Sequence, residues 1–327
     1  MKYKSGIKHL SEQINKELEA QVPHLMMVPR RNLADLIGTM LVERSANTMD
    51  LAAALPRETE RIDMRYQFIW RTLSNKRIDE VSIMQDMAKP ILKALVGNTK
   101  TLVLLMDQTT AGNGDEILML ALRIENRALP LFWHVEKTEG NIGFKDQKKV
   151  LDRVASILPS GANVVLMGDR FYGTSALVDY CTQNKWGYRL RIKGNTRIQV
   201  LNQNVAAQDL LKGEGSFVKD VFFASSGVPT NIGIIHEKGH KEPWIIVMND
   251  VPSYYKTLDY GMRWSIESMF SDFKSRGFGL EETQIKYSDR LSKLLLVMTL
   301  ALYFSVTTGI WDELNNPLPV EKKIPRK

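Results

Sequence analysis

The chain has 327 residues, 44% of them hydrophobic and 25% charged, which is ordinary for a globular protein with a sizeable core. Lysine and arginine number 44 against 37 aspartate and glutamate residues, and the resulting net charge of +7 favours a polyanionic partner such as nucleic acid. The single cysteine, Cys181, excludes disulfides within the chain and thiolate metal sites. The polar opening sequence shows no secretory signal, so we expect a reducing, cytoplasmic location.

Residues 1–98 are predicted to be helical. Apolar residues recur at helical spacing over 32–55, with a break near 44–48 and a stop at Pro56. A further helix is expected over 57–73, on which Arg57, Arg61 and Arg65 follow one another at i+4 spacing. Such a stripe is either a solvated surface or a phosphate-binding face, and the sequence leaves both open. We therefore expect residues 1–98 to be a helical DNA-binding region, although no turn signature identifies a helix-turn-helix.

Beyond residue 98 the pattern changes to strands. The apolar runs 101–107 and 163–169 are typical of buried strands, and 116–126 with 128–137 predicts a hairpin. Helical spacing returns over 146–158 and 174–186. This order predicts an α/β fold with a ribonuclease-H-like mixed sheet flanked by helices, over residues 99–312.

Residues 188–193 alternate strictly between apolar and basic side chains. One face would carry apolar residues, and the other would carry Arg189, Arg191 and Lys193. A strand with a wholly cationic face is unusual, so we expect it to contact DNA.

The remaining segments complete the predicted domain. Residues 196–243 are expected to form a β-rich insertion, and 243–250 a further strand. The uncharged run 294–311 is just long enough to cross a membrane, but its threonines and serine favour a buried C-terminal helix. The Pro- and Lys-rich tail, 313–327, is predicted to be disordered.

Asp107 and Asp169 each stand at the carboxyl end of an apolar run. Ligands of α/β sheets gather outside those strand ends. If the two strands are neighbours, the carboxylates would repel each other unless divalent cations lay between them, and oxygen ligands select Mg²⁺ or Mn²⁺. An aspartate at a strand end is, taken singly, more often a turn or cap residue. The rival carboxylates Asp115, Glu116 and Asp146 fall in loops or at a helix start.

Residues 260–274 read as an amphipathic helix with one polar ridge. At about 100° per residue, a stripe roughly 60° wide holds Tyr260, Arg263, Glu267 and Lys274. An adjoining apolar stripe holds Ile266, Met269, Phe270 and Phe273 and would face a core. By itself the ridge is typical of a salt-bridge ladder. Together with the two aspartates, Glu267 becomes the third carboxylate of a two-metal site, facing metal and not Arg263.

These residues resemble the DDE transposases of bacterial insertion sequences. The order Asp107, Asp169, Glu267 and the spacing Y-x2-R-x3-E-x6-K from Tyr260 to Lys274 are similar to the insertion-sequence-four type. The resemblance covers roughly residues 100–310. It implies that the three carboxylates bind two Mg²⁺ ions, replaceable by Mn²⁺, and that Arg263 and Lys274 contact phosphates of double-stranded DNA.

The same resemblance implies that Tyr260 lies near a base displaced from the stack and that Trp244 assists base flipping. It also implies a homodimer in the DNA synapse, in a bacterial cytoplasm and without a membrane. Cleavage would release a 3′-hydroxyl that attacks the opposite strand, giving a hairpin, or target DNA. Two alternatives stay open: a ribonuclease-H-like nuclease without strand transfer, and a domesticated or defective transposase that only binds DNA.

Overall fold

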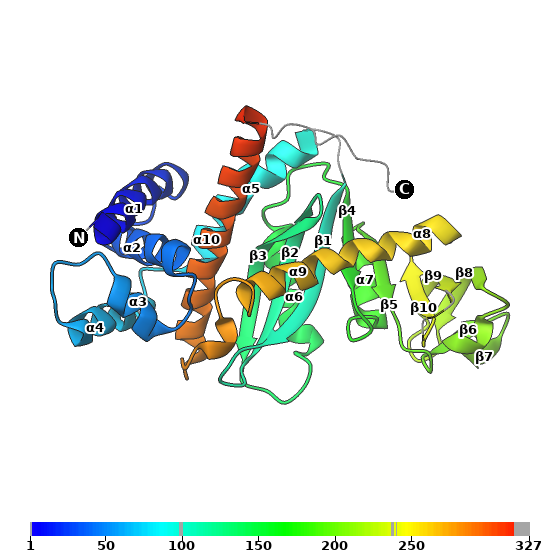
Figure 1. Ribbon diagram of the computed structural model, residues 1–327. Coiled ribbons are helices and arrows are strands. Elements are labelled where there is room, and N and C mark those ends of the chain that lie inside the picture. Colours follow the sequence, from blue (N-terminus) through cyan, green and yellow to red (C-terminus); the bar gives the residue numbers. More distant parts are fainter. Residues whose placement is uncertain (1, 98–100, 237–238, 240, 317–327) are drawn as a thin grey trace, which may run out of the picture.

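The N-terminal part is helical, as predicted, in a computed structural model that describes residues 2–97, 101–236, 239 and 241–316 (Figure 1). The helices are α1 (Lys2–Gln21), α2 (Met27–Glu43), α3 (Thr48–Ala54), α4 (Ile62–Leu73) and α5 (Glu80–Gly97). The predicted break after α2 is confirmed. Arg44 ends α2 in the left-handed conformation, and the side chain of Asn47 caps α3 by accepting a hydrogen bond from the Met49 N–H.

A ten-stranded sheet follows, in the order β3-β2-β1-β4-β5-β10-β9-β8-β6-β7. Its first half contains β1 (Leu102–Thr110), β2 (Glu116–Ile124), β3 (Arg127–Glu136), β4 (Val164–Gly168) and β5 (Gly187–Arg191). The predicted hairpin is confirmed as β2 and β3, while β1, β4 and β5 run parallel. This mixed α/β arrangement is consistent with the ribonuclease-H-like sheet expected from the sequence.

The β-rich insertion is part of the same sheet. It contributes β6 (Arg197–Val200), β7 (Gln203–Ala206), β8 (Gly215–Phe223) and β9 (Pro229–Ile235), with the short helix η1 (Ala207–Leu210). Strand β10 (Trp244–Met248) pairs with β5 on one side and β9 on the other, and so joins the insertion to the sheet.

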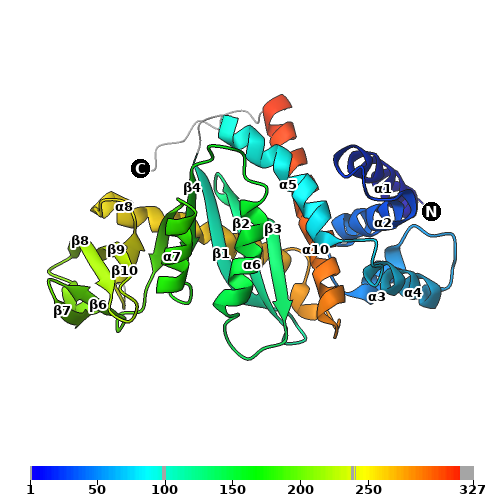
Figure 2. The same ribbon diagram turned by 180° about the vertical axis from the view of Figure 1, so that it is seen from behind.

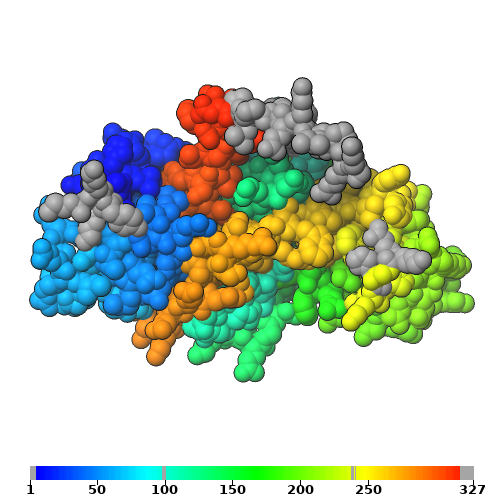
Figure 3. Space-filling model, viewed as in Figure 1, coloured from blue at the N-terminus to red at the C-terminus, as the bar shows by residue number. Residues whose placement is uncertain are grey.

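Helices cover both faces of the sheet. Helices α6 (Phe144–Ala155) and α7 (Ser175–Gln183) pack on one face, which Figure 2 turns toward the reader. On the other face α9 (Trp264–Phe273) contacts β1, β2 and β3, and α10 (Ser288–Asn315) contacts β3. In Figure 3 the segment from α8 to α10 forms a yellow and orange band across this face, between the N-terminal helices and the insertion.

The predicted continuous helix over 260–274 is wrong. The segment consists of α8 (Tyr254–Leu258), the 3₁₀ turn η2 (Asp259–Arg263) and α9, and a later 3₁₀ turn is η3 (Leu280–Glu282). Gly261, a poor helix former, lies in η2, and the tighter turn directs Tyr260 inward, where it is 2% exposed. The apolar stripe of α9 is confirmed, because its four predicted members are all buried.

Helix α10 is buried only along its first half. The buried stretch runs from Leu291 to Leu302, whereas Ile310, Trp311 and Leu314 are exposed. By length and composition α10 is the one helix of the described residues that is apolar enough to cross a membrane, and 56% of its most apolar window is buried inside the protein. The disordered tail predicted over 313–327 is wrong for its first residues, because α10 continues to Asn315; residues 317–327 lie outside the described residues.

Candidate active site

The pairing of β1 with β4 aligns the two predicted aspartates. Met106 pairs with Gly168 in the parallel register, so Asp107 and Asp169 are the next residue on each of two neighbouring strands. Asp107 does not stand at the end of its strand as predicted. Strand β1 continues to Thr110 because its last residues pair with β2 on the other side, so Asp107 marks only the end of the stretch shared with β4.

Glu267 reaches the aspartates from α9. The buried apolar face of α9 packs on the sheet, and Glu267 lies in the first helical turn, where the helix dipole favours a negative charge. A cleft of about 430 Å³ is lined by Asp107, Asp169 and Glu267, with Arg263 and Lys274 beside them. Three carboxylates distant in the sequence thus line one cleft.

Arg263 links two of these carboxylates, contrary to the expectation that Glu267 would not pair with it. Its Nη1 lies 2.8 Å from Asp107 Oδ2, and its Nη2 lies 2.5 Å from Glu267 Oε1. The guanidinium comes from η2, one turn before Glu267, and its side chain is 11% exposed. A planar fork with several donors can bind two acceptors at once, which explains why this cation neutralises both groups.

The electrostatics of the cleft are dominated by Asp107. The pKa of Asp107 is raised to about 6, chiefly by burial and to a smaller extent by the charges of Asp169 and Glu267. Arg263 and the Gln108 N–H oppose the rise by stabilising the carboxylate. Burial, and then the nearby Asp107 and Asp169, also raises the pKa of the Tyr172 phenol, which stays protonated. Arg263 therefore does not neutralise all the negative charge of the three carboxylates in the cleft.

The donor set fits Mg²⁺ or Mn²⁺ in kind. All three side chains offer hard carboxylate oxygens, which are the ligands that these ions prefer. The Arg263 guanidinium holds one oxygen of Asp107 and one of Glu267, so it would compete with an ion for these two carboxylates.

Tyr260 and Trp244 contact each other beside Arg263. Their rings form an edge-to-face pair with centroids 5.3 Å apart, in a small cluster with Ile246 and Met248. The Arg263 guanidinium carbon lies 5.7 Å from the centre of the Tyr260 ring, which connects this pair to the cleft. Trp244 opens β10 as predicted and is partly buried.

Lys274 ends α9 at the rim of the cleft. Its Nζ lies 3.0 Å from Glu281 Oε1, in the segment that follows the helix. Lys274 is therefore near the carboxylates, although it does not share a helical stripe with Tyr260, which faces the interior.

The wholly cationic strand face predicted around β5 is wrong. Arg189 is 3% exposed, pairs with Asp250 and donates a hydrogen bond to the Tyr188 carbonyl. Arg191 is partly buried and lies 3.5 Å from Glu242. Lys193 follows the end of the strand, is exposed and lies over the Phe171 ring. Because β10 covers this edge of β5, its neighbouring residues supply partners that the alternation of β5 alone does not reveal.

The predicted stripe of Arg57, Arg61 and Arg65 is also wrong, because α4 begins only at Ile62. Arg57 precedes the helix and pairs with Asp35 at 3.2 Å, and Arg61 pairs with Asp63 at 2.6 Å. Arg65 is 6% exposed and donates to the carbonyls of Ala53 and Glu60. Arg65 therefore holds the α3–α4 connection and presents no free cation.

The sequence did not single out several residues of the site. Gln108 follows Asp107, donates to Glu116 and to the Gly140 carbonyl, and accepts from the Ile142 N–H. Tyr172 is buried near Asp107 and Asp169. Ser271, Ser275 and Glu281 also line the cleft. Only Gln108 and Tyr172 could have been suspected from the sequence, because they lie close in the chain to Asp107 and Asp169.

Residues 143–304 match the family model described as the transposase DDE domain. This stretch of the chain is similar to a transposase DDE domain. The matched range includes Asp169, Glu267 and the residues from Tyr260 to Lys274, and it begins after Asp107. The match supports the resemblance to DDE transposases, which act on DNA. No curated protein matches the chain.

The sheet that carries this match extends beyond the matched residues. Strands β1, β2 and β3 precede residue 143 but form one sheet with β4, so the cleft needs both parts of the chain. The first aspartate of the cleft, Asp107, is supplied by this earlier part.

Proposed function

We propose that the protein is a cut-and-paste DNA transposase of the insertion-sequence-four type. It cleaves the ends of a mobile element and joins the released 3′-hydroxyls to target DNA in the bacterial cytoplasm. The observation that carries this proposal is the cleft in which Asp107, Asp169 and Glu267 meet Arg263 and Lys274, within a transposase DDE domain.

The carboxylates would hold two Mg²⁺ ions, or Mn²⁺ in their place. Such ions lower the pKa of an attacking water or hydroxyl and stabilise the leaving oxygen in phosphoryl transfer. The protein's own task is to orient Asp107 and Asp169 through the paired strands β1 and β4, and Glu267 through α9. Positioning and charge neutralisation supply most of the catalysis in this class of reaction.

Arg263 would change partners when DNA binds. In the DNA-free protein it neutralises Asp107 and Glu267. When ions replace it there, its guanidinium would bind a phosphate of the element end, and Lys274 would contact a second phosphate at the rim of the cleft after leaving Glu281. Because the Arg263 guanidinium lies next to the carboxylates, it would hold the scissile phosphate near them.

Tyr260 and Trp244 would act on the base next to the cut. Their edge-to-face pair lies beside Arg263, so a base displaced from the duplex could stack where the two rings now meet. Base flipping of this kind would support cleavage through a hairpin intermediate.

Two protomers would bind two ends in a synapse.

Incubation of the protein with element ends and Mg²⁺ tests the proposal. Excised or hairpin-capped ends, followed by joining to target DNA, are expected. Nicking of unrelated DNA without joining would instead support a ribonuclease-H-like nuclease. End binding without cleavage would support a defective transposase that acts as a DNA-binding protein.

A further inference from the structure

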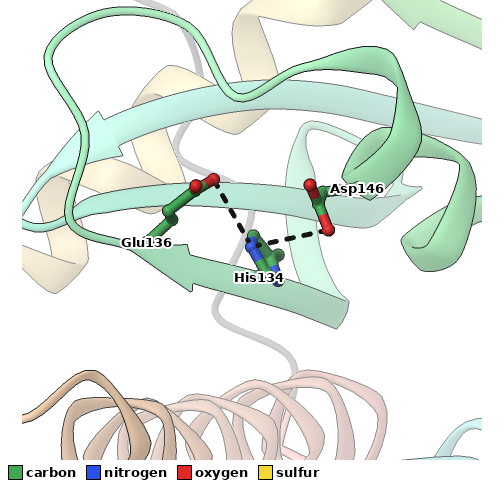
Figure 4. A group of neighbouring side chains, drawn as sticks. All are labelled: His134, Glu136 and Asp146. Atoms are coloured by element: carbon green, nitrogen blue, oxygen red, sulfur yellow. Dashed lines mark ion pairs between the residues drawn. The ribbon is translucent and has the colours of Figure 1, made fainter.

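A second group of candidate ligands lies where β3 passes into α6. His134 and Glu136 stand two residues apart on β3, so both point to the same face of the sheet, and Asp146 stands in the first turn of α6 (Figure 4). Residues that pair across neighbouring strands point to the same face of the sheet. His134 pairs with Leu118, and Leu118 pairs with Gln108, the neighbour of Asp107 in β1. Neighbouring residues of a strand point to opposite faces. This group therefore lies on the face opposite the carboxylate cleft.

The distances in this group are suited to a shared ion. His134 Nε2 lies 3.7 Å from Glu136 Oε2 and 3.9 Å from Asp146 Oδ1, and the three ligand atoms all lie within 4.8 Å of one another. No other group of His, Cys, Asp and Glu in the described part of the chain meets this condition. Ligands bound to one tetrahedral ion are about 3.3 Å apart for bonds of about 2.0–2.1 Å. Coordination would shorten the two His134 distances by about 0.4–0.6 Å and the distance between the two carboxylate oxygens by at most about 1.5 Å.

Among the described residues, none makes a hydrogen bond to the His134 ring. His24, which also lies beside a carboxylate, differs: its Nδ1 bonds to Asp86 at 2.9 Å and its Nε2 to Ser82 at 3.1 Å. Both carboxylates in Figure 4 point toward the His134 ring, which is partly buried between β3 and α6. The imidazole is thus aimed at two acceptors that lie beyond hydrogen-bonding distance.

We propose that His134, Glu136 and Asp146 form a structural site for one divalent transition-metal ion of the Zn²⁺ type. One imidazole nitrogen and two carboxylate oxygens are a common donor set for such ions, with the remaining positions filled by water. Lys149 competes for the site, because its Nζ lies 2.7 Å from the same Asp146 oxygen that faces His134. The ion must displace this exposed ammonium.

The ion would fasten the loop that leads toward the cleft. Its ligands lie on both sides of residues 137–143, and within that loop the Gly140 carbonyl and the Ile142 N–H bond to the Gln108 side chain. Gln108 directly follows Asp107 on β1. Fixing the loop at both ends would stabilise the folded chain and hold the strand that carries Asp107.

Zn²⁺ binding to the full-length chain tests this site apart from transposition. In a parent protein carrying Asp107→Asn, Asp169→Asn and Glu267→Gln, the cleft carboxylates cannot compete for the ion. Equilibrium dialysis without DNA is expected to give about one Zn²⁺ per chain. Saturating Zn²⁺ is expected to raise the Tm by a few degrees, because it binds only the folded state.

Variants of that parent identify the ligands. His134→Gln and, separately, Glu136→Gln should weaken Zn²⁺ binding at least about tenfold and remove the rise in Tm, since each loses a ligand. Lys149→Met should tighten binding. His24→Gln is the matched control and should bind as the parent does. The proposal is overturned if the parent shows no saturable binding, or if both ligand variants bind Zn²⁺ within twofold of the parent.

Discussion

Asp107 should make the stability of the protein depend on pH. Its pKa is about 6 in the folded state against an ordinary value of 3.8, because the carboxyl is buried and lies near Asp169 and Glu267. The folded state therefore holds the proton more tightly than the unfolded state. The proton on Asp107 therefore stabilises the folded state. This contribution to the free energy of unfolding is greatest below pH 4 and is lost as the pH rises to about 6.

Asp107→Asn should remove this dependence. In the presence of a chelator, the variant should match the wild type near pH 4 and exceed its free energy of unfolding by about 2–3 kcal/mol above pH 6. Urea unfolding at a series of pH values measures the difference. A difference that does not change between pH 4 and pH 7 would show that the Asp107 carboxyl is not perturbed.

Arg263 and Asp107 should be energetically coupled because both side chains of this ion pair are mostly buried. In a double-mutant cycle with Arg263→Met and Asp107→Asn, the coupling measured by urea unfolding without divalent metal is expected to be about 1–2 kcal/mol. The exposed pair of Lys148 and Asp152 is the control, for which Lys148→Met and Asp152→Asn should give about 0.5 kcal/mol or less. Equal coupling energies for the two pairs would show that burial does not strengthen the ion pair of Arg263 and Asp107.

At the scale of elements, the turn between β1 and β2 holds the segment after α9. A Cβ on Gly112 would lie 2.0 Å from the Glu281 carbonyl oxygen, and Asn113 donates to the Ile285 carbonyl in the same segment. Glu281 in turn pairs with Lys274 at the end of α9. The position of Lys274 therefore depends on a close backbone approach that only glycine permits.

Gly112→Ala should consequently cost about 1–3 kcal/mol of stability, because backbone atoms must shift to admit the methyl group. Gly143→Ala is the control: nothing lies within 4 Å of the added carbon, and a change of about 0.5 kcal/mol or less is expected. Urea denaturation compares the two. Equal losses would mean that the approach at Gly112 is unimportant.

The elements that the sequence predicted well are those that bury continuous apolar runs. Strands β1 and β4 and the apolar face of α9 were recognisable because their own side chains determine their burial. Pairing between distant segments was not: nothing in 197–235 indicates that these strands continue the main sheet through β10. The 3₁₀ turn at Tyr260 depends likewise on the packing of Tyr260 against Trp244.

The same distinction explains the errors for single residues. The predicted proximity of Asp107, Asp169 and Glu267 is confirmed, because each follows or interrupts an apolar pattern within its own segment. Arg189 and Arg65 were misjudged because their partners, Asp250 and the Ala53 carbonyl, come from other elements. Basic spacing in a sequence predicts a cation, but it does not predict whether that cation already has a partner.

For the whole molecule, α10 joins the N-terminal helices to the sheet. It contacts α2, α4 and α5 as well as β3, and the Trp133 indole bonds to Ser292, which bonds to Glu80. One hydrophobic core includes residues from α1 to α10. The helical region and the catalytic region, distinct in the sequence, therefore share a core and should unfold together.

Leu295→Ala should lower the stability of both regions, because Leu295 is fully buried in α10, and the cost should be about 3 kcal/mol. Hydrogen exchange at increasing urea should show α2 and β4 losing protection at one shared, lowered midpoint. Leu314→Ala, on the exposed end of the same helix, should leave the midpoint unchanged. Separate midpoints for α2 and β4 would contradict a common core.

Cleavage of element ends by carboxylate variants tests whether Asp107, Asp169 and Glu267 form the catalytic site. Asp107→Asn, Asp169→Asn and Glu267→Gln are each expected to reduce strand cleavage in Mg²⁺ about a thousandfold or more, while end binding stays within a few-fold of the wild type. Glu116→Gln, which changes a nearby carboxylate bonded to Gln108 and Thr110, should keep cleavage within a few-fold. Near-normal cleavage by any one of the three variants would contradict the account.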